Sequence, residues 1–384
     1  MTAARRVQIY FFLQFMSIGM VNAYAGIWFD ARGLSSVQIG AISAVPNIIV
    51  LLIVVWVGRI ADRASDWRQV IILCAVISAL APFGLIFVSS FLGILLFWSI
   101  MSVAQRTGLP VSDAAAIRMA RREGLSFGMF RGLSTLGYLL VIIFAGYVLR
   151  DEGVELFLPL FIGFGLLRGL SSLILPRFRA QTPEAAPQGL SNLRSVMKAW
   201  FLLPLFGYAL LDTPHIILNS FQGLLWARQG ISTEVIGLLI ALGAGAETLM
   251  FFGFAAVAKR FRPLTLVLIG VAASIVRWLA MATSPEVPTL VLLQSLHAVT
   301  YASSFLAITN YIADTVSEDN AAQAQGLLVN MELLVSSLGL IAFGWLVGMY
   351  GAEAYVASAG LAVLAGLCVL GGRALRPERP TFSS

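Results

Sequence analysis

The chain has 384 residues, of which 59% are hydrophobic and only 11% are charged, and its formal net charge is +6. Ordinary soluble domains carry about 25% charged residues, so this composition excludes a soluble globular protein. The chain is therefore interpreted as an integral membrane protein.

Apolar stretches long enough to cross a bilayer recur along the whole chain. A membrane-spanning helix needs about 20 predominantly apolar residues, and about twelve such stretches are present. The predicted fold class is therefore all-α, with twelve transmembrane helices. In chain order the predicted spans are Val7–Phe29, Val37–Gly58, Gln69–Val88, Phe91–Ile117, Phe127–Val148, Leu156–Leu175, Trp200–Trp226, Val235–Ala258, Leu264–Ala282, Thr289–Thr315, Ala324–Met349 and Ala352–Gly371.

Most of the 25 Lys and Arg residues fall in alternate predicted loops. If the N-terminus is placed in the cytoplasm, only Arg32, Arg150 and Arg228 lie in loops on the opposite side. This distribution follows the positive-inside rule and predicts a multi-pass protein of the cell inner (plasma) membrane with both termini in the cytoplasm. The excess of positive charge thus orients the protein in the bilayer, and no nucleic-acid partner is expected.

A short motif occurs twice in the sequence. Residues 31–36 followed by Ile39-Gly40 reappear as residues 227–233 followed by Ile236-Gly237, and each copy comes after a Trp and before a new predicted helix. The repeat predicts two pseudo-symmetric six-helix halves, the plan of a transporter that binds its substrate near the bilayer midplane. The predicted domains are an N-terminal half, a Pro-, Ala- and Gln-rich cytoplasmic linker, and a C-terminal half with a short cytoplasmic tail, at residues 1–177, 178–197 and 198–384.

Three charged residues lie inside predicted spans of the N-terminal half. A charge at the centre of a bilayer costs at least about 2.5–3.5 kcal/mol, so it persists only when it is paired or faces a polar cavity. Arg106 and Asp113 are two helical turns apart and share a face, and Arg131 lies on the next helix, which the short link makes an antiparallel neighbour. We predict that all three face a water-filled cavity. The alternative is a structural ion pair that only joins the two helices.

The C-terminal half contains several ionisable residues in predicted spans. Glu247, Arg277 and His297 are predicted to form a second charged cluster. A histidine has an ordinary pKa near 6.5 and a buried carboxylate can hold a proton, so these residue types suit proton coupling. Asp212 and Glu332 are further candidates, because a carboxylate inside the membrane needs a partner or water.

Other polar residues in the spans have simpler explanations. His215 follows Pro214 and is expected at a helix kink or at the rim, and Arg168 is expected to extend its charge toward the cytoplasmic surface. The two histidines lie on different spans without a set of metal ligands. No metal site, cofactor or enzyme activity is therefore predicted.

The loop after the second span carries a recognisable pattern. Residues 58–68 resemble the signature loop Gly-x-x-x-Asp-Arg-x-Gly-Arg-Arg of the major facilitator superfamily, with matches at Gly58, Asp62 and Arg63. Ser65 and Asp66 depart from the Gly and Arg of the pattern. The resemblance implies the major facilitator fold, a functional monomer, and a role for the three matching residues as a conformational latch.

The polar residues in the spans are similar to those of one branch of this superfamily. The branch contains lactose permease, the nucleoside proton symporters and the 3-phenylpropionic acid transporters. Asp113, Arg131 and Tyr138 fall where lactose permease has its sugar-binding carboxylate, arginine and aromatic residue, and Phe127-Gly128 match the residues that lead into the arginine. The positions of the family's charged network are occupied by Glu247, Arg277 and His297.

Two departures concern the proton site. Thr300 stands where lactose permease carries the glutamate that exchanges the proton, and Gln294 stands where it carries a lysine. The proton site is therefore not carried over from the resemblance. Glu332, Glu247 and His297 are the alternatives, and so is the absence of coupling.

The residues and the resemblance together predict a secondary active transporter that moves a small organic solute by alternating access. The leading hypothesis is proton-coupled uptake of an aromatic carboxylate such as a phenylpropanoate. A proton symporter for a sugar or nucleoside is the first alternative, and a transport-inactive receptor or assembly factor is the alternative from another class. The solute is predicted to bind Asp113, Arg131, Tyr138 and Arg106, and coupling is assigned to Glu247, Arg277, His297, Glu332 and Asp212.

Overall fold

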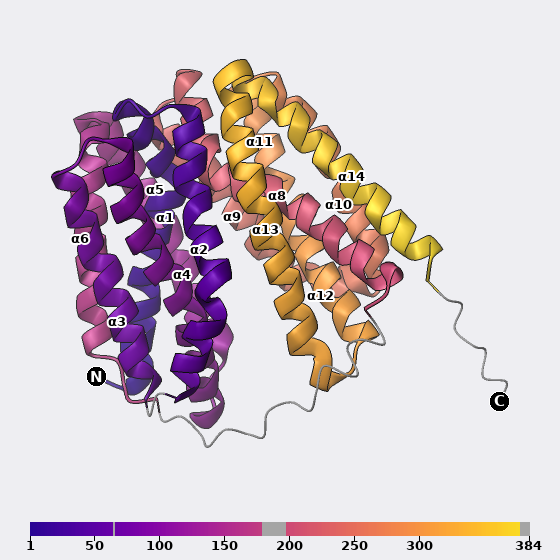
Figure 1. The fold of residues 1–384 in the computed structure, drawn as a ribbon, viewed down its shortest axis with the longest axis horizontal. Coiled ribbons are helices and arrows are strands. Elements are labelled where there is room, and N and C mark those ends of the chain that lie inside the picture. Colours follow the sequence, from indigo (N-terminus) through magenta and orange to yellow (C-terminus); the bar gives the residue numbers. More distant parts are fainter. Residues whose placement is uncertain (64–65, 179–196, 377–384) are drawn as a thin grey trace. The chain divides into compact units, whose positions relative to one another are not determined.

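The computed structural model describes the backbone of residues 1–63, 66–178 and 197–376, and within these ranges it leaves out the side chains of residues 54–63, 318–319 and 322. The regular elements of the described ranges are helices (Figure 1). The α-helices are α1 (Ala3–Ala31), α2 (Ser36–Arg63), α3 (Trp67–Leu80), α4 (Phe91–Arg122), α5 (Phe127–Glu152), α6 (Phe157–Leu173), α8 (Ala199–Arg228), α9 (Thr233–Ala258), α10 (Pro263–Ala282), α11 (Val287–Ser295), α12 (Ser304–Thr315), α13 (Glu318–Tyr350) and α14 (Tyr355–Ala374).

The helices are long and apolar enough to cross a membrane. In the described part of the chain, 11 stretches meet the length and hydropathy that a span requires. One of them, Gln323–Ala374, contains both α13 and α14, while another, Val287–Thr315, contains both α11 and α12. When α13 and α14 are counted separately, the predicted number of twelve spans is reached. The predicted all-α membrane fold is confirmed.

Side chains at the helix starts explain where several spans begin. Ser90 accepts a hydrogen bond from the backbone N–H of Gly93 at the start of α4, and Ser126 accepts one from Gly128 at the start of α5. Such caps satisfy N–H groups that the first helical turn leaves unpaired. Asp66, which departs from the signature loop, caps α3 through its Oδ1 atom. Helix α4 ends at Arg122 and α5 begins at Phe127, so the link between them is short, as predicted.

The chain forms two compact units that differ from a simple division at the linker. Unit 1 contains residues 1–186, 217–241 and 340–351, and unit 2 contains residues 187–216, 242–339 and 352–384. The two predicted halves remain a prediction, and most of the predicted linker, residues 179–196, lies outside the described residues.

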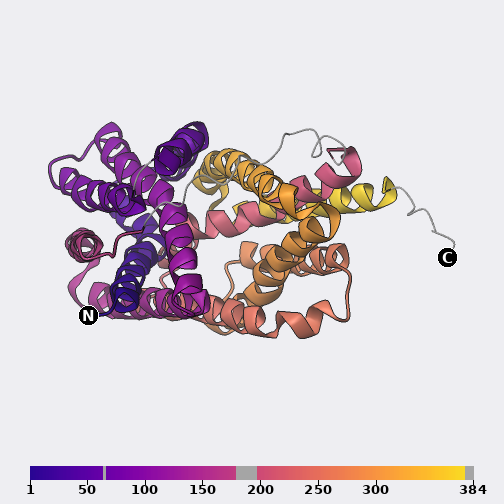
Figure 2. The ribbon, with the colours of Figure 1, turned by 90° about the horizontal axis from the view of Figure 1, so that it is seen from below.

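Helices α1–α6 form a bundle in unit 1. Helix α1 packs against α5 and α6, α3 packs against α4 and α6, and α2 packs against α4. These helices run beside one another in Figure 1, and Figure 2 shows the same bundle from below. The packing places the polar face of α4 beside α5, where the first candidate site lies.

Glycines allow the later segments of unit 1 to approach this bundle closely. A Cβ atom at Gly26 in α1 would lie only 2.3 Å from the carbonyl oxygen of Ser220 in α8, and one at Gly223 would lie 2.3 Å from the carbonyl oxygen of Ala23. Any larger residue would therefore force the two backbones apart. Close backbone contact through small residues is the usual way in which membrane helices pack.

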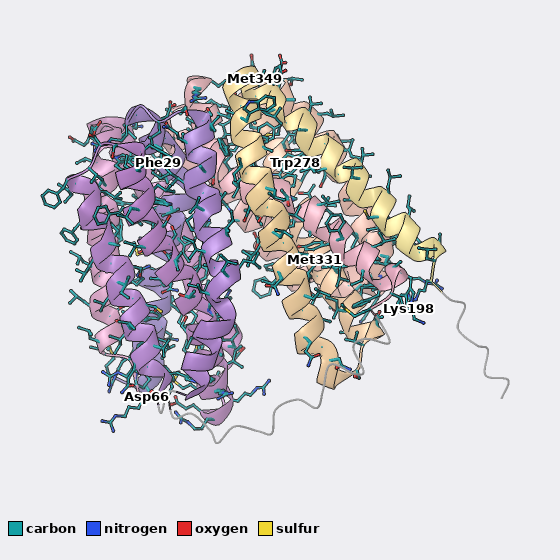
Figure 3. All side chains as sticks on the ribbon, in the orientation of Figure 1. Phe29, Asp66, Lys198, Trp278, Met331 and Met349 are labelled. Carbon is teal, nitrogen blue, oxygen red and sulfur yellow. The ribbon has the colours of Figure 1, made fainter. Side chains whose placement is uncertain are left out.

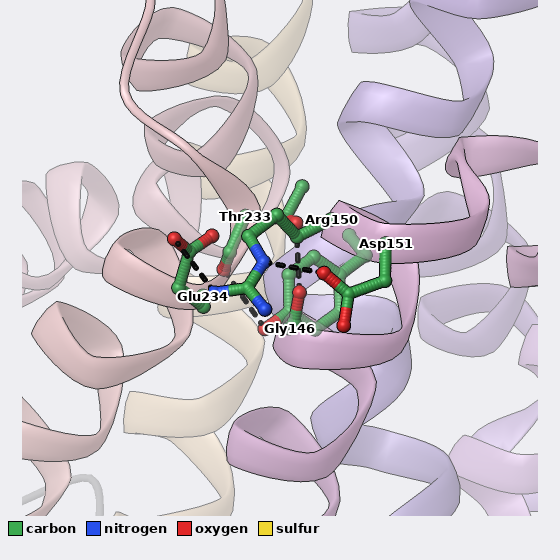
Figure 4. Close-up of polar contacts among 6 residues, drawn as sticks. Gly146, Arg150, Asp151, Thr233 and Glu234 are labelled. Atoms are coloured by element: carbon green, nitrogen blue, oxygen red, sulfur yellow. Dashed lines mark hydrogen bonds and ion pairs between the residues drawn. The ribbon is translucent and has the colours of Figure 1, made fainter.

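Polar contacts join α5 to the start of α9 in the same unit (Figure 4). The Thr233 hydroxyl donates to the Gly146 carbonyl oxygen at 2.8 Å, and Arg150 Nη1 lies 3.5 Å from Glu234 Oε1. Arg150 Nε also donates to Asp151 Oδ1 at 2.6 Å. The guanidinium of Arg150 is thus shared between its own helix and α9.

The two copies of the repeated motif contact each other in unit 1. Arg228, in the second copy, donates through Nη2 to Asp30 Oδ1 at 2.5 Å and through Nη1 to Ser36 Oγ at 3.1 Å. Ser36 closes the first copy and opens α2. The similarity that the sequence analysis found therefore marks two segments that are in direct contact.

Unit 2 has its own core around α10. This helix packs against α14 and α12, and the rings of Trp278 and Tyr355 stack with their centroids 5.9 Å apart. Trp278 is completely buried within the unit (Figure 3). Beside it, the predicted tenth span is not a continuous α-helix, because a π-helical segment, Ala298–Ser303, separates α11 from α12.

Candidate functional site

The first candidate site lies in unit 1, where α4 and α5 run side by side. Arg131 Nη1 lies 3.7 Å from Asp113 Oδ2, and the side chains of Arg131 and Asp113 are 49% and 29% exposed. The other carboxylate oxygen, Asp113 Oδ1, is buried and has no hydrogen-bond partner among the described residues. The structure therefore brings the predicted pair together and leaves both groups with unused bonding capacity.

An aromatic ring that the sequence analysis missed completes this site. The Cζ atom of Arg131 lies 4.8 Å from the ring centroid of Phe15 in α1, which is a cation–π distance. Tyr138 lies on α5 two turns beyond Arg131 and is half-buried. Its backbone carbonyl oxygen would be 3.1 Å from a Cβ atom at Gly19, so α5 and α1 are in close contact at this level.

Arg106 is exposed on α4 and makes no ion pair with any described residue. Pro110 lies between Arg106 and Asp113 inside the same helix. Because proline has no N–H, the carbonyl group of Arg106 loses its usual helical donor. This part of α4 therefore offers a guanidinium and a carboxylate two helical turns apart.

The second candidate site lies in unit 2 and is centred on Arg277, which is completely buried. Its Nη2 atom donates to Gln294 Oε1 at 2.6 Å, and its Nη1 atom donates to Thr300 Oγ1 at 2.9 Å. Nη1 also lies 3.2 Å from His297 Nδ1. The two residues that depart from lactose permease, Gln294 and Thr300, thus bind the arginine directly.

His297 connects Arg277 to a carboxylate. Its Nε2 atom lies 3.5 Å from Glu247 Oε2, while its Nδ1 atom faces Arg277. The predicted cluster of Glu247, Arg277 and His297 is therefore assembled in space. Within the described residues, the acid and the arginine are joined through the imidazole and not by a direct ion pair.

His215 belongs to this site, and the expectation that it lies at the rim was wrong, while a kink at Pro214 stays a prediction. Its side chain is 5% exposed, its Nε2 atom lies 3.0 Å from Thr300 Oγ1, and its Nδ1 atom lies 3.2 Å from the Leu211 carbonyl oxygen. Helix α8 continues through Pro214 without a break, so the proline does not push the histidine outward. The sequence contains no local signal for a contact with Thr300, which is 85 residues away.

The π-helical segment positions this site. Thr300 lies inside it and His297 immediately precedes it, so the wider turn sets the directions of both side chains. Single π-helical turns are rare and are often found at functional sites. The segment thus explains how the tenth span can present Gln294, His297 and Thr300 to one arginine of α10.

Asp212 and Glu332 lie in unit 2 but outside these contacts. Asp212 is 8% exposed, and its Oδ1 atom has no hydrogen-bond partner among the described residues. Glu332 on α13 is half-buried and close enough to Asp212 for electrostatic interaction. Neither carboxylate forms an ion pair with a described cation.

Two other predictions have different outcomes. Arg168 does not extend toward the membrane surface, because it is 2% exposed and its Nη2 atom donates to Ser78 Oγ at 2.6 Å. That expectation was wrong, since a serine on the neighbouring helix α3 holds the guanidinium inside unit 1. The predicted latch residues Gly58, Asp62 and Arg63 lie on α2, but their side chains are outside the described residues.

Comparison with known proteins identifies the family. A model of the MFS_1 like family matches residues 4–357, which is most of the chain. The chain belongs to this family. It is therefore a transporter of the major facilitator superfamily, as the signature loop and the repeat led us to expect.

Two curated relatives are similar over most of their length. Maltose permease of Geobacillus stearothermophilus is 27% identical over 294 residues, which cover 74% of this chain and 72% of the permease. A probable 3-phenylpropionic acid transporter of Escherichia coli is 25% identical over 334 residues, which cover 81% of this chain and 82% of that protein.

Solved structures confirm the fold. The nucleoside transporter NupG has a TM-score of 0.80 at 19% identity, with 97% of this chain and 98% of that chain covered. A bacterial homologue of the human lysosomal transporter Spinster has a TM-score of 0.73 at 17% identity, with 97% and 96% covered.

Proposed function

We propose that this transporter takes up a small aromatic carboxylate, such as a phenylpropanoate, together with a proton, by alternating access. The observation that supports the solute class is the Arg131 guanidinium, which is half-exposed, stands over Phe15, and is only loosely paired with Asp113. Its 3.7 Å separation from the carboxylate exceeds the about 2.7–2.9 Å of a charge-assisted hydrogen bond. The Arg131 guanidinium can therefore donate hydrogen bonds to a second carboxylate.

The geometry suits an acid that carries a ring. A guanidinium presents a planar fork of N–H donors that matches a carboxylate in two parallel hydrogen bonds. Phe15 of α1 supplies an apolar surface beside that fork. Tyr138, on α5, is a second aromatic residue. Arg106 adds a second exposed guanidinium on α4. The similarity to a probable 3-phenylpropionic acid transporter supports the same solute class.

A proton would accompany the acid because it cancels the charge of the carboxylate during transport. We assign this part of the function to the unit 2 residues Glu247, Arg277, His297, Glu332 and Asp212. Ionisable residues inside a membrane protein are costly and commonly mark proton pathways. Under this proposal the protein is a monomeric symporter of the plasma membrane, with both termini in the cytoplasm and with Gly58, Asp62 and Arg63 as a conformational latch.

A sugar or nucleoside symporter is the second candidate. The buried Asp113 Oδ1 atom has an unused acceptor position, which suits the hydroxyl group of a neutral ring compound. The relatives include a maltose permease, and NupG has a similar fold. This candidate predicts that binding depends on Asp113 more than on Arg131.

Thermal stabilisation of the purified protein distinguishes these candidates. The protein is heated with 3-phenylpropanoate, maltose or uridine, because a ligand present at about 100 times its Kd stabilises the folded state by about 2.7 kcal/mol. We expect stabilisation by the acid, its loss in Arg131→Ala, and its retention in the control Arg122→Ala, which removes an exposed arginine from the end of α4.

Uptake into liposomes under an inward proton gradient tests the coupling. We expect the gradient to accelerate uptake of 3-phenylpropanoate, and a protonophore to abolish that acceleration. Stabilisation by maltose or uridine that survives Arg131→Ala and disappears in Asp113→Asn would transfer the assignment to the second candidate. An absence of uptake for all three compounds would refute the proposed solute classes.

A further inference from the structure

The contacts of His215 determine which of its nitrogens carries a proton. Its Nδ1 atom lies 3.2 Å from the carbonyl oxygen of Leu211, and a carbonyl oxygen can only accept a hydrogen bond. Nδ1 is therefore protonated. The Nε2 atom lies 3.0 Å from Thr300 Oγ1, so this contact decides whether the ring is neutral or charged.

Thr300 resolves that question because its other partner is an obligate donor. Arg277 Nη1 donates to Thr300 Oγ1 at 2.9 Å, and a guanidinium has no acceptor. The hydroxyl proton of Thr300 must therefore find its acceptor elsewhere. Among the described residues, His215 Nε2 is the acceptor within hydrogen-bond distance. The chain of donors runs from Arg277 through Thr300 and His215 to the Leu211 carbonyl, and it requires a neutral His215.

His297 has the opposite tautomer. Arg277 Nη1 faces His297 Nδ1 at 3.2 Å, so Nδ1 is the acceptor. The remaining proton is on Nε2, which points to Glu247 Oε2 at 3.5 Å. The two hydrogens of Nη1 are sufficient for Thr300 and His297.

We propose that Arg277 holds His215 and His297 in opposite neutral tautomers, and that His215 is a positioning residue that acts on Arg277 through Thr300. The tautomers themselves do not depend on the proposed proton coupling. Only their consequence, the identity of the group that carries the transported proton, rests on that proposed function. A proton added to His297 Nδ1 would face the Arg277 donor, and one added to His215 Nε2 would leave the Thr300 hydroxyl without its acceptor. Under the proposed coupling, the transported proton is accordingly carried by a carboxylate and not by an imidazole.

The surrounding groups fit this assignment. Among the described residues, the other ionisable side chains that interact electrostatically around the cluster are Tyr208 and Asp212 from α8, Glu332 from α13, Tyr301 from the π-helical segment and Tyr355 from α14. Thr300 can both accept and donate, which a neutral relay requires and a glutamate at this position would not supply. Gln294 offers Arg277 an amide oxygen at 2.6 Å, where a lysine would repel the guanidinium.

The tautomers can be measured directly, because the chain contains only 2 histidines. The protein is labelled with 15N-histidine, and the ring nitrogens are observed by NMR between about pH 5 and pH 8, the range in which an ordinary histidine titrates. His297→Gln assigns the two sets of signals. We expect one protonated and one unprotonated nitrogen in each ring, with protonated Nδ1 in His215 and protonated Nε2 in His297. A cationic ring, or the same tautomer in both rings, would overturn the proposal, and neither outcome depends on transport.

Substitutions at Thr300 test the positioning role. Thr300→Ser keeps the hydroxyl group and is expected to keep both tautomers and the rate of uptake. Thr300→Val removes it and is expected to lower the maximal rate about tenfold, the scale of a lost buried hydrogen bond, with little change in KM. Thr213→Val is the matched control, because that buried hydroxyl donates, among the described residues, only to the Ala209 carbonyl.

The NMR signals separate this proposal from the proposed function. We expect Thr300→Val to convert His215 to a mixture of tautomers and Thr300→Ser to leave it in one. This result would show that the Thr300 hydroxyl positions His215, whether or not 3-phenylpropanoate is the solute. If His215 keeps one tautomer in Thr300→Val, the relay through Thr300 is refuted. His215→Asn, which retains a donor near the Nδ1 position, is expected to lower the maximal rate as Thr300→Val does. An unchanged rate in a variant that folds would refute the positioning role of His215.

Discussion

Gly344 in α13 lies directly against Gly40 in α2 within unit 1. A Cβ atom at Gly344 would be 3.2 Å from the Cα atom of Gly40 and 2.5 Å from the carbonyl oxygen of Ser36. Both obstacles are backbone atoms, which cannot rotate away as a side chain can. A residue larger than glycine at position 40 or 344 would therefore force α2 and α13 apart.

This contact predicts different effects on stability for alanine substitutions at two glycines of the same helix. Gly344→Ala is expected to lower the melting temperature in detergent, because the methyl group would separate α13 from α2. Gly348, one turn further along α13, has no atom of a described residue within 4 Å of its Cβ position. Gly348→Ala is expected to leave stability unchanged or to raise it by up to about 1 kcal/mol, the helix preference of Ala over Gly. Equal effects of the two substitutions would contradict the contact.

A second prediction concerns Tyr24, a fully buried residue of α1. Its hydroxyl group donates to the Ile142 carbonyl oxygen at 2.5 Å, close to where α5 meets α9. Tyr24→Phe is expected to destabilise the protein by about 1 kcal/mol, the net contribution of a typical hydrogen bond. Tyr147→Phe on α5 is the control, since the Tyr147 side chain is 43% exposed. The comparison is made by thermal unfolding, and a larger loss in Tyr147→Phe would argue against the buried hydrogen bond.

The pairing of Asp113 with Arg131 could be predicted from the sequence, because this pairing depends on local features. A short turn makes α4 and α5 antiparallel neighbours, and the helical period then gives the shared face. The grouping of Glu247, Arg277 and His297 was also anticipated, with help from the family resemblance. Their functional roles, like that of Tyr138, stay predictions.

The contacts that were missed depend on features that no short stretch of sequence encodes. His215 reaches Thr300 from α8, which continues past Pro214, and Thr300 lies in a π-helical segment of the tenth span. Phe15 approaches Arg131 from α1, across a helix interface whose rotation is set by the packing of the whole bundle. Arg168 is held by Ser78, a residue whose inward direction could not be known before the helices were placed.

A third prediction tests whether Arg277 requires a neutral acceptor at residue 294. Gln294 is 3% exposed, so a charge introduced there cannot be solvated by water. Gln294→Lys places an ammonium group against the buried guanidinium, and an uncompensated buried charge costs about 3–5 kcal/mol. We expect this variant to be poorly folded or strongly destabilised. Gln294→Glu supplies a counter-charge to Arg277 and is expected to unfold at a temperature closer to that of the wild type. The opposite order of stabilities would contradict the contact between residues 277 and 294.

The last prediction concerns the buried pair of Arg168 and Ser78. Ser78 Oγ accepts a hydrogen bond from Arg168 at 2.6 Å and lies 2.7 Å from the Cys74 carbonyl oxygen, to which it can donate. Within the described residues, Arg168 has no carboxylate partner, and its Nε atom is buried without a hydrogen bond. Ser78→Ala leaves the guanidinium without its acceptor and is expected to cost about 1–3 kcal/mol.

Removal of the charge should reverse this loss. Replacement of a buried ionic group by an apolar one of similar volume is often neutral or stabilising, so the double variant Ser78→Ala with Arg168→Met is expected to be more stable than Ser78→Ala alone. Thermal unfolding of the two single variants and the double variant gives the coupling between the residues. Additive losses would show that Ser78 does not hold the Arg168 guanidinium. If the double variant regains stability but loses uptake of 3-phenylpropanoate, the buried arginine has a role in transport besides packing.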